Sequence, residues 1–197
     1  MKQPDEIRQA LIDGTVRVVA RNGLDKATTK ALATEAGVNE VNIYRMFNGK
    51  DDLLKKTFSA LDNELVSEIL SRLPIMDVTA MPIEDRCRAL FFFVWKYLVG
   101  NSEKCLCFIR YYYSPYFEKY SFEEHKANYR IVVEKFAPAF KQGVDVWLML
   151  NHILDAMLSS AVKVFQKEMP DTDESAERVY NLVYSAVEPQ LSWSKKQ

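Results

Sequence analysis

The sequence predicts an all-α protein of about nine helices, with a small N-terminal part joined to a larger helical body. Apolar residues recur at steps of three and four through most of the 197 residues, and this is the period of a helix. Hydrophobic residues make up 48% of the chain, with only 6 Gly and 7 Pro, so the composition is that of a globular protein. Most of these Gly and Pro residues separate the periodic stretches, where they end or begin helices.

Three helices are predicted in the N-terminal part, each ended by a glycine. Glycine suits these positions because it accepts the left-handed backbone that closes a helix. Gly14 lies inside the first helix and is predicted to mark a close packing contact. In chain order the helices are 5–21, ended by Asn22-Gly23; a helix that begins at Thr28 or Thr29 and stops at Gly37; and a helix capped by Asn39 and ended by Asn48-Gly49.

Six further helices are predicted in the body, with a loop at 73–81 between the first two. The Tyr-rich stretch after Ser102 would also suit a strand, but a helix is favoured because helices flank it and no partner strand is found. A capping-box pattern, Ser121 with Glu124, opens the helix that follows. The predicted helices are 51–72, 82–100, 102–114, 121–136, one within 143–169, and 173–187.

The last two helices carry more apolar surface than one core needs. In the stretch 143–169 the polar residues fall on one stripe, and apolar residues surround most of the remaining circumference. A homodimer formed through the last two helices is therefore predicted. The alternative is that both helices complete the core of a monomer.

The charge and the cysteine content are both ordinary for a cytoplasmic protein. The cytoplasm is therefore the predicted location. The net charge is -1, and residues 1–56 contain 10 Lys or Arg against 8 Asp or Glu, a slight basic excess. Cys87, Cys105 and Cys107 are interpreted as reduced core thiols, with a redox switch as the alternative. We expect neither a signal peptide nor a membrane helix.

The residues that would indicate catalysis or metal binding are not found in the required patterns. His125 and His152 lack the Cys or carboxylate spacing of a zinc site. The sequence has no nucleophile motif, phosphate-binding glycine loop or paired catalytic carboxylates. We therefore expect a protein that is not an enzyme and uses no cofactor or metal.

The second and third helices have the spacing of a helix-turn-helix. They are short, and the turn between them is Gly37-Val38-Asn39. Ile43 and Phe47 would anchor the third helix, so its other faces carry hydrogen-bonding side chains. This is the geometry that presents a helix to the major groove of DNA.

Residues 11–54 resemble the tetracycline-repressor-type (TetR) transcriptional regulators. The stretch LIDGTVRVVARNGLDKATTKALATEAGVNEVNIYRMFNGKDDLL carries the family's Gly before a Thr-Thr pair, its A-x-x-A-G-V turn, its I/L-Y-x-x-F recognition helix and its K-x-x-L opening of the fourth helix. The resemblance implies a helix-turn-helix DNA-binding domain at 1–50 and a helical ligand-binding and dimerisation domain at 51–197. Val41 and Met46 depart from the residues common in the family.

The resemblance also implies which residues contact a double-stranded DNA operator. Thr28, Thr29 and Lys50 would bind phosphates at helix N-termini, and Tyr44 would use its hydroxyl on the backbone. Glu40, Asn42 and Arg45 lie where base readers would be, and Val41 could contact a thymine methyl. The complete set of predicted DNA contacts is Thr28, Thr29, Lys30, Asn39, Glu40, Val41, Asn42, Tyr44, Arg45 and Lys50.

Members of this family bind a small molecule in the body and then lose DNA affinity. The resemblance therefore implies a ligand-released repressor that binds a palindromic operator as a homodimer, with an apolar or aromatic effector. An activator of the same fold, and a helical small-molecule-binding or thiol redox-sensing protein without DNA binding, are the alternatives. The residues proposed to contact the effector are aromatic: Phe92, Phe93, Tyr97, Phe108, Tyr112 and Trp147.

Overall fold

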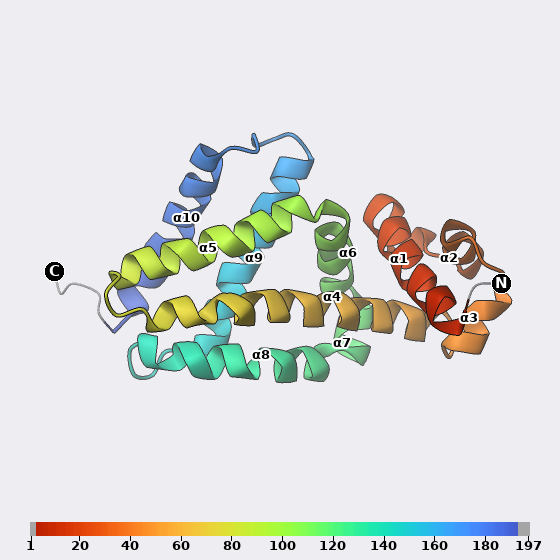
Figure 1. Cartoon of the computed structure of the whole chain (residues 1–197), viewed down its shortest axis with the longest axis horizontal. Helices are drawn as coiled ribbons and strands as arrows, with labels where there is room; N and C mark the ends of the chain where they lie inside the picture. The colour runs from red at the N-terminus through yellow and green to blue at the C-terminus, as the bar shows by residue number, and fades with distance from the viewer. Residues whose placement is uncertain (1–2, 193–197) are drawn as a thin grey trace. The chain divides into compact units, whose positions relative to one another are not determined.

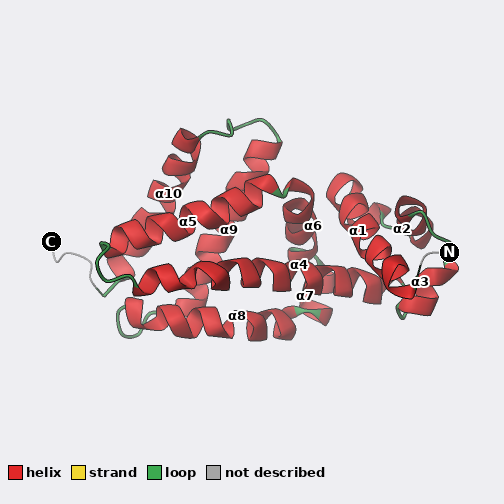
Figure 2. Cartoon of the chain, viewed as in Figure 1, coloured by secondary structure: helices red, strands yellow, loops and turns green. Residues whose placement is uncertain are grey.

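A computed structural model describes residues 3–192 and confirms the all-α prediction (Figure 2). This part of the chain contains ten α-helices, joined by short turns and 3-10 helices. The α-helices are α1 (Pro4–Asn22), α2 (Thr29–Ala36), α3 (Val41–Met46), α4 (Lys50–Arg72), α5 (Ile83–Gly100), α6 (Ser102–Tyr112), α7 (Pro115–Tyr120), α8 (Phe122–Phe136), α9 (Val146–Phe165) and α10 (Asp173–Val187). The 3-10 helices are Leu24–Lys26, Leu73–Asp77, Ala137–Ala139 and Glu188–Gln190.

The chain forms two compact units. Unit 1 comprises residues 1–64 and 103–127, and unit 2 comprises residues 65–102 and 128–197. All three dividing points fall inside helices, after Glu64 in α4, Ser102 in α6 and Ala127 in α8. The predicted domain boundary at residue 50 concerns function rather than packing and stays a prediction. The outer ends of the two predicted domains, residues 1–2 and 193–197, lie outside the described residues.

The first three helices of unit 1 pack on one another around a small apolar core (Figure 1). Leu11, Leu32 and Ile43, one from each helix, are completely buried. Gly14 confirms the predicted close contact, because a Cβ built there would lie 3.0 Å from the main-chain nitrogen of Ala36. The absence of a side chain at Gly14 thus lets α1 approach α2 closely.

The remainder of unit 1 contains an aromatic cluster. Phe58 on α4 stacks on Tyr111 of α6 with ring centroids 4.6 Å apart, and meets Phe117 of α7 edge-on at 5.5 Å. Phe108 lies 5.0 Å from the same ring. Such ring pairs add to the stabilisation that burial provides. They join α4, α6 and α7 into one core.

Unit 2 is built on α5, α9 and α10, which contact one another, with the second parts of α4 and α8. Its core includes Trp95 on α5, Leu158 on α9 and Val183 on α10, all buried. Phe91 stacks parallel to Trp95 at 6.2 Å and meets Tyr180 of α10 edge-on at 5.3 Å. Aromatic side chains of α5 therefore hold α10 against it.

Three local predictions need correction. The stretch 115–120 forms α7, which was not predicted, because Pro115 ends one helix and opens the next. Within the predicted loop 73–81, Leu73–Asp77 forms a 3-10 helix. Ser121, predicted to cap α8 with its side chain, is buried and its hydroxyl lies 3.0 Å from that of Tyr111, in the core of unit 1.

Helix α9 is long and apolar enough, by length and composition, to cross a membrane, which the sequence analysis did not expect. Core helices of soluble proteins meet the same criterion. Only 22% of its most apolar stretch is buried within a single chain. Most of its other residues are half-buried, and those that are exposed are Leu148, His152, Ser159 and Lys163.

Candidate nucleic-acid interface and effector cavity

Helix α3 buries one side and exposes the other. Ile43 and Phe47 are buried against α1 and α2, as the spacing predicted. Val41 and Tyr44 have 68% and 64% of their surfaces exposed, and Arg45 is exposed beside them. Large apolar side chains that remain in water on a short, rigidly held helix indicate a contact surface.

Side chains from outside the helix hold both ends of α3. At its start, the Asn39 side chain accepts a hydrogen bond from the main-chain nitrogen of Val41 at 2.9 Å. At its end, the guanidinium of Arg8 donates to the Met46 carbonyl at 3.1 Å and lies 4.7 Å above the Phe47 ring. A six-residue helix has little stability of its own, so these contacts fix its direction.

Two predicted DNA contacts bind each other. Thr29 opens α2, and its hydroxyl donates a hydrogen bond to the carboxylate of Glu40, just before α3. Both residues are half-buried. Thr28, by contrast, is exposed and caps α2, accepting from the main-chain nitrogen of Ala31 at 3.2 Å. The Thr29–Glu40 bond therefore ties the two helices of the helix-turn-helix together.

The remaining predicted contacts lie at the edges of this surface. Lys30 on α2 is exposed. The Asn42 side chain donates to the Asn39 carbonyl at 3.1 Å. Lys50 is half-buried at the start of α4, with its Nζ 6.0 Å from the ring centroid of Tyr116 on α7. All ten residues thus lie within α2, α3, the turn between them and the start of α4.

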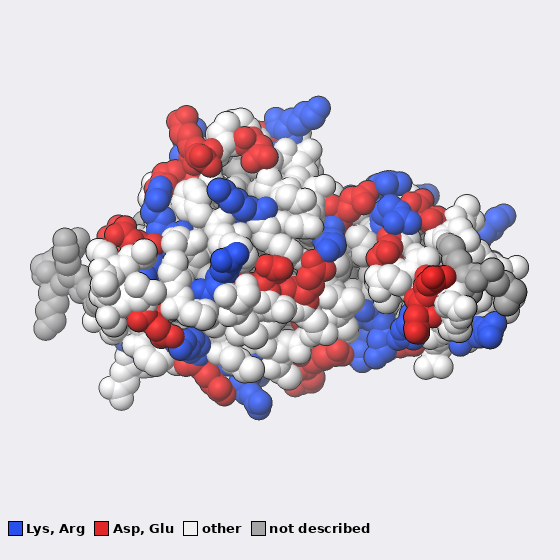
Figure 3. Space-filling model, in the orientation of Figure 1, with Lys and Arg blue, Asp and Glu red and all other residues white. Residues whose placement is uncertain are grey.

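The surface near these helices is not uniformly basic. On the face seen in Figure 3, Lys and Arg side chains are interspersed with Asp and Glu over the N-terminal helices. This agrees with the slight basic excess counted in residues 1–56. On this face, individual side chains rather than a broad positive surface would supply any attraction to phosphates.

Helix α6 is attached to α1 by polar contacts that sequence reasoning missed. The guanidinium of Arg110 donates to the Val19 carbonyl near the end of α1 at 2.7 Å. Arg21 of α1 pairs with Glu103 at 2.9 Å. The partners are 91 and 82 residues apart in the chain, so no local pattern could reveal them.

A buried hydrogen-bonding contact lies inside the aromatic cluster of unit 1. His125 Nδ1 is 2.8 Å from Asp62 Oδ1, and the two side chains are 0% and 1% exposed. Phe117 and Tyr112 meet the imidazole edge-on at 5.3 and 5.5 Å. The sequence presented His125 as a lone histidine, because its partner lies 63 residues away.

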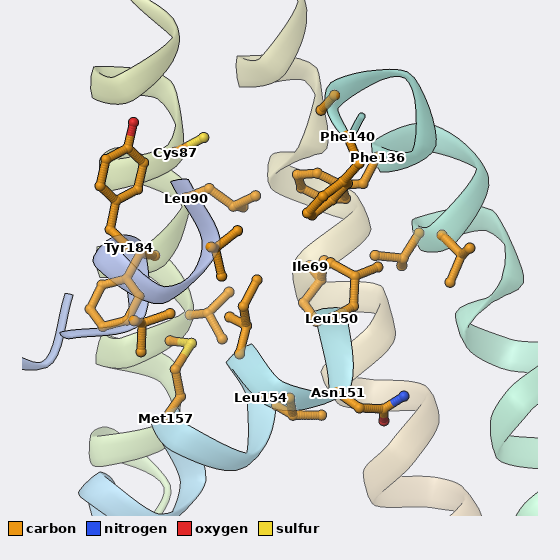
Figure 4. A pocket seen from close by; sticks show the side chains of 18 of the residues that line it. Ile69, Cys87, Leu90, Phe136, Phe140, Leu150, Asn151, Leu154, Met157 and Tyr184 are labelled. Carbon is orange, nitrogen blue, oxygen red and sulfur yellow. The ribbon is translucent and has the colours of Figure 1, made fainter. Parts of the chain in front are cut away.

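Unit 2 contains a partly open cavity of about 150 Å³ (Figure 4). Residues of α4, α5, α8, α9 and α10 line it. Hydrocarbon and aromatic side chains such as Leu90, Phe136, Leu154 and Met157 form most of its wall. None of the described lining residues is Asp, Glu, Lys, Arg or His.

The six aromatic residues proposed for effector binding are divided between the two units. Trp147 on α9 lines the cavity. Phe108 and Tyr112 belong to the aromatic cluster of unit 1, where their rings stack 5.9 Å apart. Phe92, Phe93 and Tyr97 are half-buried on α5 and are not among the described lining residues. Sequence reasoning missed the aliphatic lining, since buried Leu and Met residues are the ordinary material of any core.

All three cysteines are free thiols, and burial determines their pKa values. Cys105 and Cys107 are buried, which confirms the prediction of core thiols for these two, and burial raises the pKa of each to about 12. Cys87 is half-buried and lines the cavity, and burial raises its pKa to about 11. Thiolates, the reactive form, are therefore scarce at neutral pH.

Among residues 3–192, no three His, Cys, Asp or Glu side chains are grouped so that they could hold a metal ion.

Sequence comparison identifies the N-terminal region. Residues 11–57 match the model of the family of bacterial regulatory proteins called tetR. The nicotine-responsive transcriptional repressor HdnoR of Paenarthrobacter nicotinovorans is 34% identical over 62 residues, which are 32% of each chain. The similarity to this relative thus covers about a third of its length.

Solved structures share the complete fold. A TetR family transcription regulator from Marinobacter aquaeolei VT8 superposes with a TM-score of 0.71 at 18% identity, over 92% of this chain and 95% of its own. The fatty acid degradation regulator FadR from Bacillus halodurans gives 0.70 at 22%, over 93% and 96%. FadR from Bacillus subtilis, in complex with stearoyl-CoA, gives 0.68 at 18%, over 90% and 97%.

The exposed side of α3, the helix-turn-helix that holds it and the match over residues 11–57 agree with one another. The larger helical body has the architecture of the same group of structures. Residues 11–57 thus match the tetR family of bacterial regulatory proteins, and the described part of the chain has the fold of solved TetR-family regulators.

Proposed function

We propose that this protein is a repressor that binds a palindromic operator as a homodimer and leaves it when a small molecule occupies the cavity of unit 2. The observation that carries the proposal is the division of α3, which buries Ile43 and Phe47 while it exposes Val41, Tyr44 and Arg45. A helix held in this way can enter the major groove without losing its packing.

The roles of individual residues follow from their positions and chemistry. Arg45 and Asn42 are suited to guanine and adenine, and Val41 to a thymine methyl group. The Tyr44 hydroxyl, Thr28, Lys30 and Lys50 would bind the sugar-phosphate backbone, where α2 and α4 present their N-termini. Asn39 would hold α3 in register through its contact with Val41.

The homodimer is proposed to form through α9 and α10. Leu148 on α9 and Leu182 on α10 are 58% and 73% exposed, and little of the most apolar stretch of α9 is buried in one chain. A second copy is a better cover than lipid, because α9 also carries Asp155 and Lys163, which are costly to place in a bilayer. Cytoplasmic location accompanies this proposal, since the DNA partner is there.

Operator release is proposed to act through α4. This helix carries Lys50 at its start and Ile69, which lines the cavity, near its end. A dimer that reads successive major grooves must hold its recognition helices about 34–36 Å apart, so a small tilt of α4 would misplace them. FadR from Bacillus subtilis, which has a similar fold, has been solved in complex with stearoyl-CoA, and this supports a ligand with a hydrocarbon part in this fold. To act as a switch, the effector must prefer the DNA-incompetent state, by about 1.4 kcal/mol for each tenfold change in affinity.

Selection of bound duplexes from genomic fragments tests the proposal. Enrichment of one sequence with two-fold symmetry, at half-site spacing close to one helical turn, is expected. Failure to enrich any sequence would favour the alternative of a helical ligand-binding protein without DNA binding. Transcription of the neighbouring genes should rise when this gene is deleted, whereas a fall would identify an activator.

Thiol redox sensing is the weaker alternative for the body. Burial raises the pKa of Cys87, Cys105 and Cys107 above that of an ordinary thiol. Redox-sensing cysteines have low pKa values and are accessible. Operator affinity that stays constant after mild peroxide treatment would agree with this reasoning.

A further inference from the structure

The wall of the unit 2 cavity offers a bound molecule no charged partner. Its described lining contains no acidic, basic or imidazole side chain. The ionisable side chains that line it are those of cysteine and tyrosine. Burial raises the pKa of the Cys87 thiol to about 11 and raises the pKa of the Tyr180 hydroxyl well above its usual range. The cavity is therefore uncharged at neutral pH.

Two of the polar side chains in the wall are bonded to the protein. The Tyr180 hydroxyl donates to the Glu84 carbonyl at 3.3 Å. Asn151, which carries the amide among the lining residues, donates from its Nδ2 to the Trp147 carbonyl one turn earlier on α9 at 2.8 Å. In the view of Figure 4, this amide lies at one end of the lining residues and Cys87 and Tyr184 lie at the other. The middle of the wall is hydrocarbon.

The volume limits the size of the occupant. A cavity of about 150 Å³ is comparable with an engineered apolar cavity that stays dry and admits benzene. Pockets for drug-sized ligands usually exceed about 300 Å³. The cavity as it stands therefore fits a molecule of about one aromatic ring with a short substituent.

We propose that the effector is a small, uncharged, predominantly hydrocarbon molecule, and that the cavity rejects carboxylates and amines of the same shape. An ionised group placed in this wall would lose its hydration and gain no counter-ion, which is the costly case for a buried charge. This inference rests on the proposed function only in taking the cavity as the effector site.

The test uses three probes of similar size that differ in charge. Ethylbenzene, phenylacetate and 2-phenylethylammonium are titrated into the full-length protein at pH 7.5, without DNA, by calorimetry and by Trp fluorescence. Ethylbenzene is expected to bind at least about a hundredfold more tightly than either ion. Affinities of the two ions within threefold of that of ethylbenzene, or no binding of ethylbenzene, would overturn the proposal.

Two variants place the binding in this cavity. Leu154→Trp fills part of the space between buried side chains and should reduce ethylbenzene affinity at least tenfold. Because a large substitution can prevent folding, Asn151→Asp provides an isosteric second test. It introduces a carboxylate at the wall, so 2-phenylethylammonium should bind at least tenfold more tightly than it does to the wild type.

His152→Asp is the matched control for the charge variant. His152 is the next residue of α9, is exposed and is not among the described lining residues. The His152→Asp variant should leave the affinities of all three probes unchanged. An equal gain in 2-phenylethylammonium affinity in both variants would show that the amine binds outside the cavity.

The ligand class and the proposed function fail in different ways. If ethylbenzene binds selectively but does not release the operator, the repressor mechanism fails while the class of ligand stands. If the ions bind as well as ethylbenzene and release the operator, the class of ligand is wrong while the mechanism stands.

Discussion

The hydroxyl of Thr29 donates a hydrogen bond to the carboxylate of Glu40, joining the first residue of α2 to the residue that precedes α3. This hydrogen bond links the two helices of the helix-turn-helix. It also places a negative charge close to the proposed path of the phosphates. Glu40 therefore has a structural role whether or not it reads a base.

Glu40→Gln separates these roles. Glutamine keeps an acceptor for Thr29 and removes the charge, so affinity for DNA of any sequence should rise, roughly threefold to tenfold, with the enriched operator unchanged. Fluorescence anisotropy on operator and scrambled duplexes measures this. A changed base preference at one operator position would instead make Glu40 a base reader.

Lys50→Ala should reduce the salt dependence of operator binding. If the ammonium neutralises one phosphate, the slope of log affinity against log salt falls in magnitude by about one. Lys96→Ala, an exposed lysine on α5, is the control and should leave the slope unchanged. An unchanged slope in the Lys50 variant would remove Lys50 from the interface.

Gly14→Ala should destabilise the N-terminal helices. The new Cβ would lie 3.0 Å from the main-chain nitrogen and 3.1 Å from the Cβ of Ala36, so α1 and α2 must separate. A loss of about 1–3 kcal/mol is expected from urea unfolding. Gly100→Ala is the matched control, because nothing lies within 4 Å of its Cβ position, and it should change stability by less than about 0.5 kcal/mol.

Asp62→Ala should be among the most damaging single changes. It leaves the fully buried imidazole of His125 without the carboxylate 2.8 Å away, and a loss of about 3–5 kcal/mol is expected for breaking a buried pair. Glu174→Ala breaks the exposed pair with Arg178, and should cost less than about 0.5 kcal/mol. Similar losses for the two variants would contradict a structural role for the buried contact.

Alkaline pH should weaken the fold through its thiols. Burial raises the pKa of Cys105 and Cys107 from 9.0 to about 12, so above pH 9 the unfolded chain loses thiol protons that the folded chain retains. Stability then falls as pH rises, by about 1.4 kcal/mol per pH unit for each thiol between pH 9 and 12. Urea unfolding from pH 8 to pH 11 measures this fall.

The double variant Cys105→Ala/Cys107→Ala isolates the thiol contribution. Its stability should decline less steeply over the same pH range, because the two thiols have been removed. The decline that remains should come from the buried tyrosines. Parallel declines in the variant and the wild type would mean that these thiols are ionised as easily in the folded protein as in the unfolded one.

The sequence determined the parts of this protein that depend on neighbours in the chain. Helical spacing predicted that Ile43 and Phe47 are buried on α3 and that its other side chains face outward, and glycine positions predicted where α1 and α2 end. The TetR resemblance of residues 11–54 rests on short motifs in the same stretch and agrees with the family match at 11–57. Periodicity suffices here, because a helix fixes the direction of each side chain relative to its neighbours.

Only the tertiary structure decided which distant residues meet. Spacing indicates that one side of a helix is buried, but not against what, so Phe108 and Trp147 looked alike in sequence and belong to different units. The contacts of Asp62 with His125 and of Arg110 with Val19 join residues 63 and 91 positions apart. The neutrality of the cavity has the same origin, since it depends on which side chains from five helices converge rather than on the charge of any one segment.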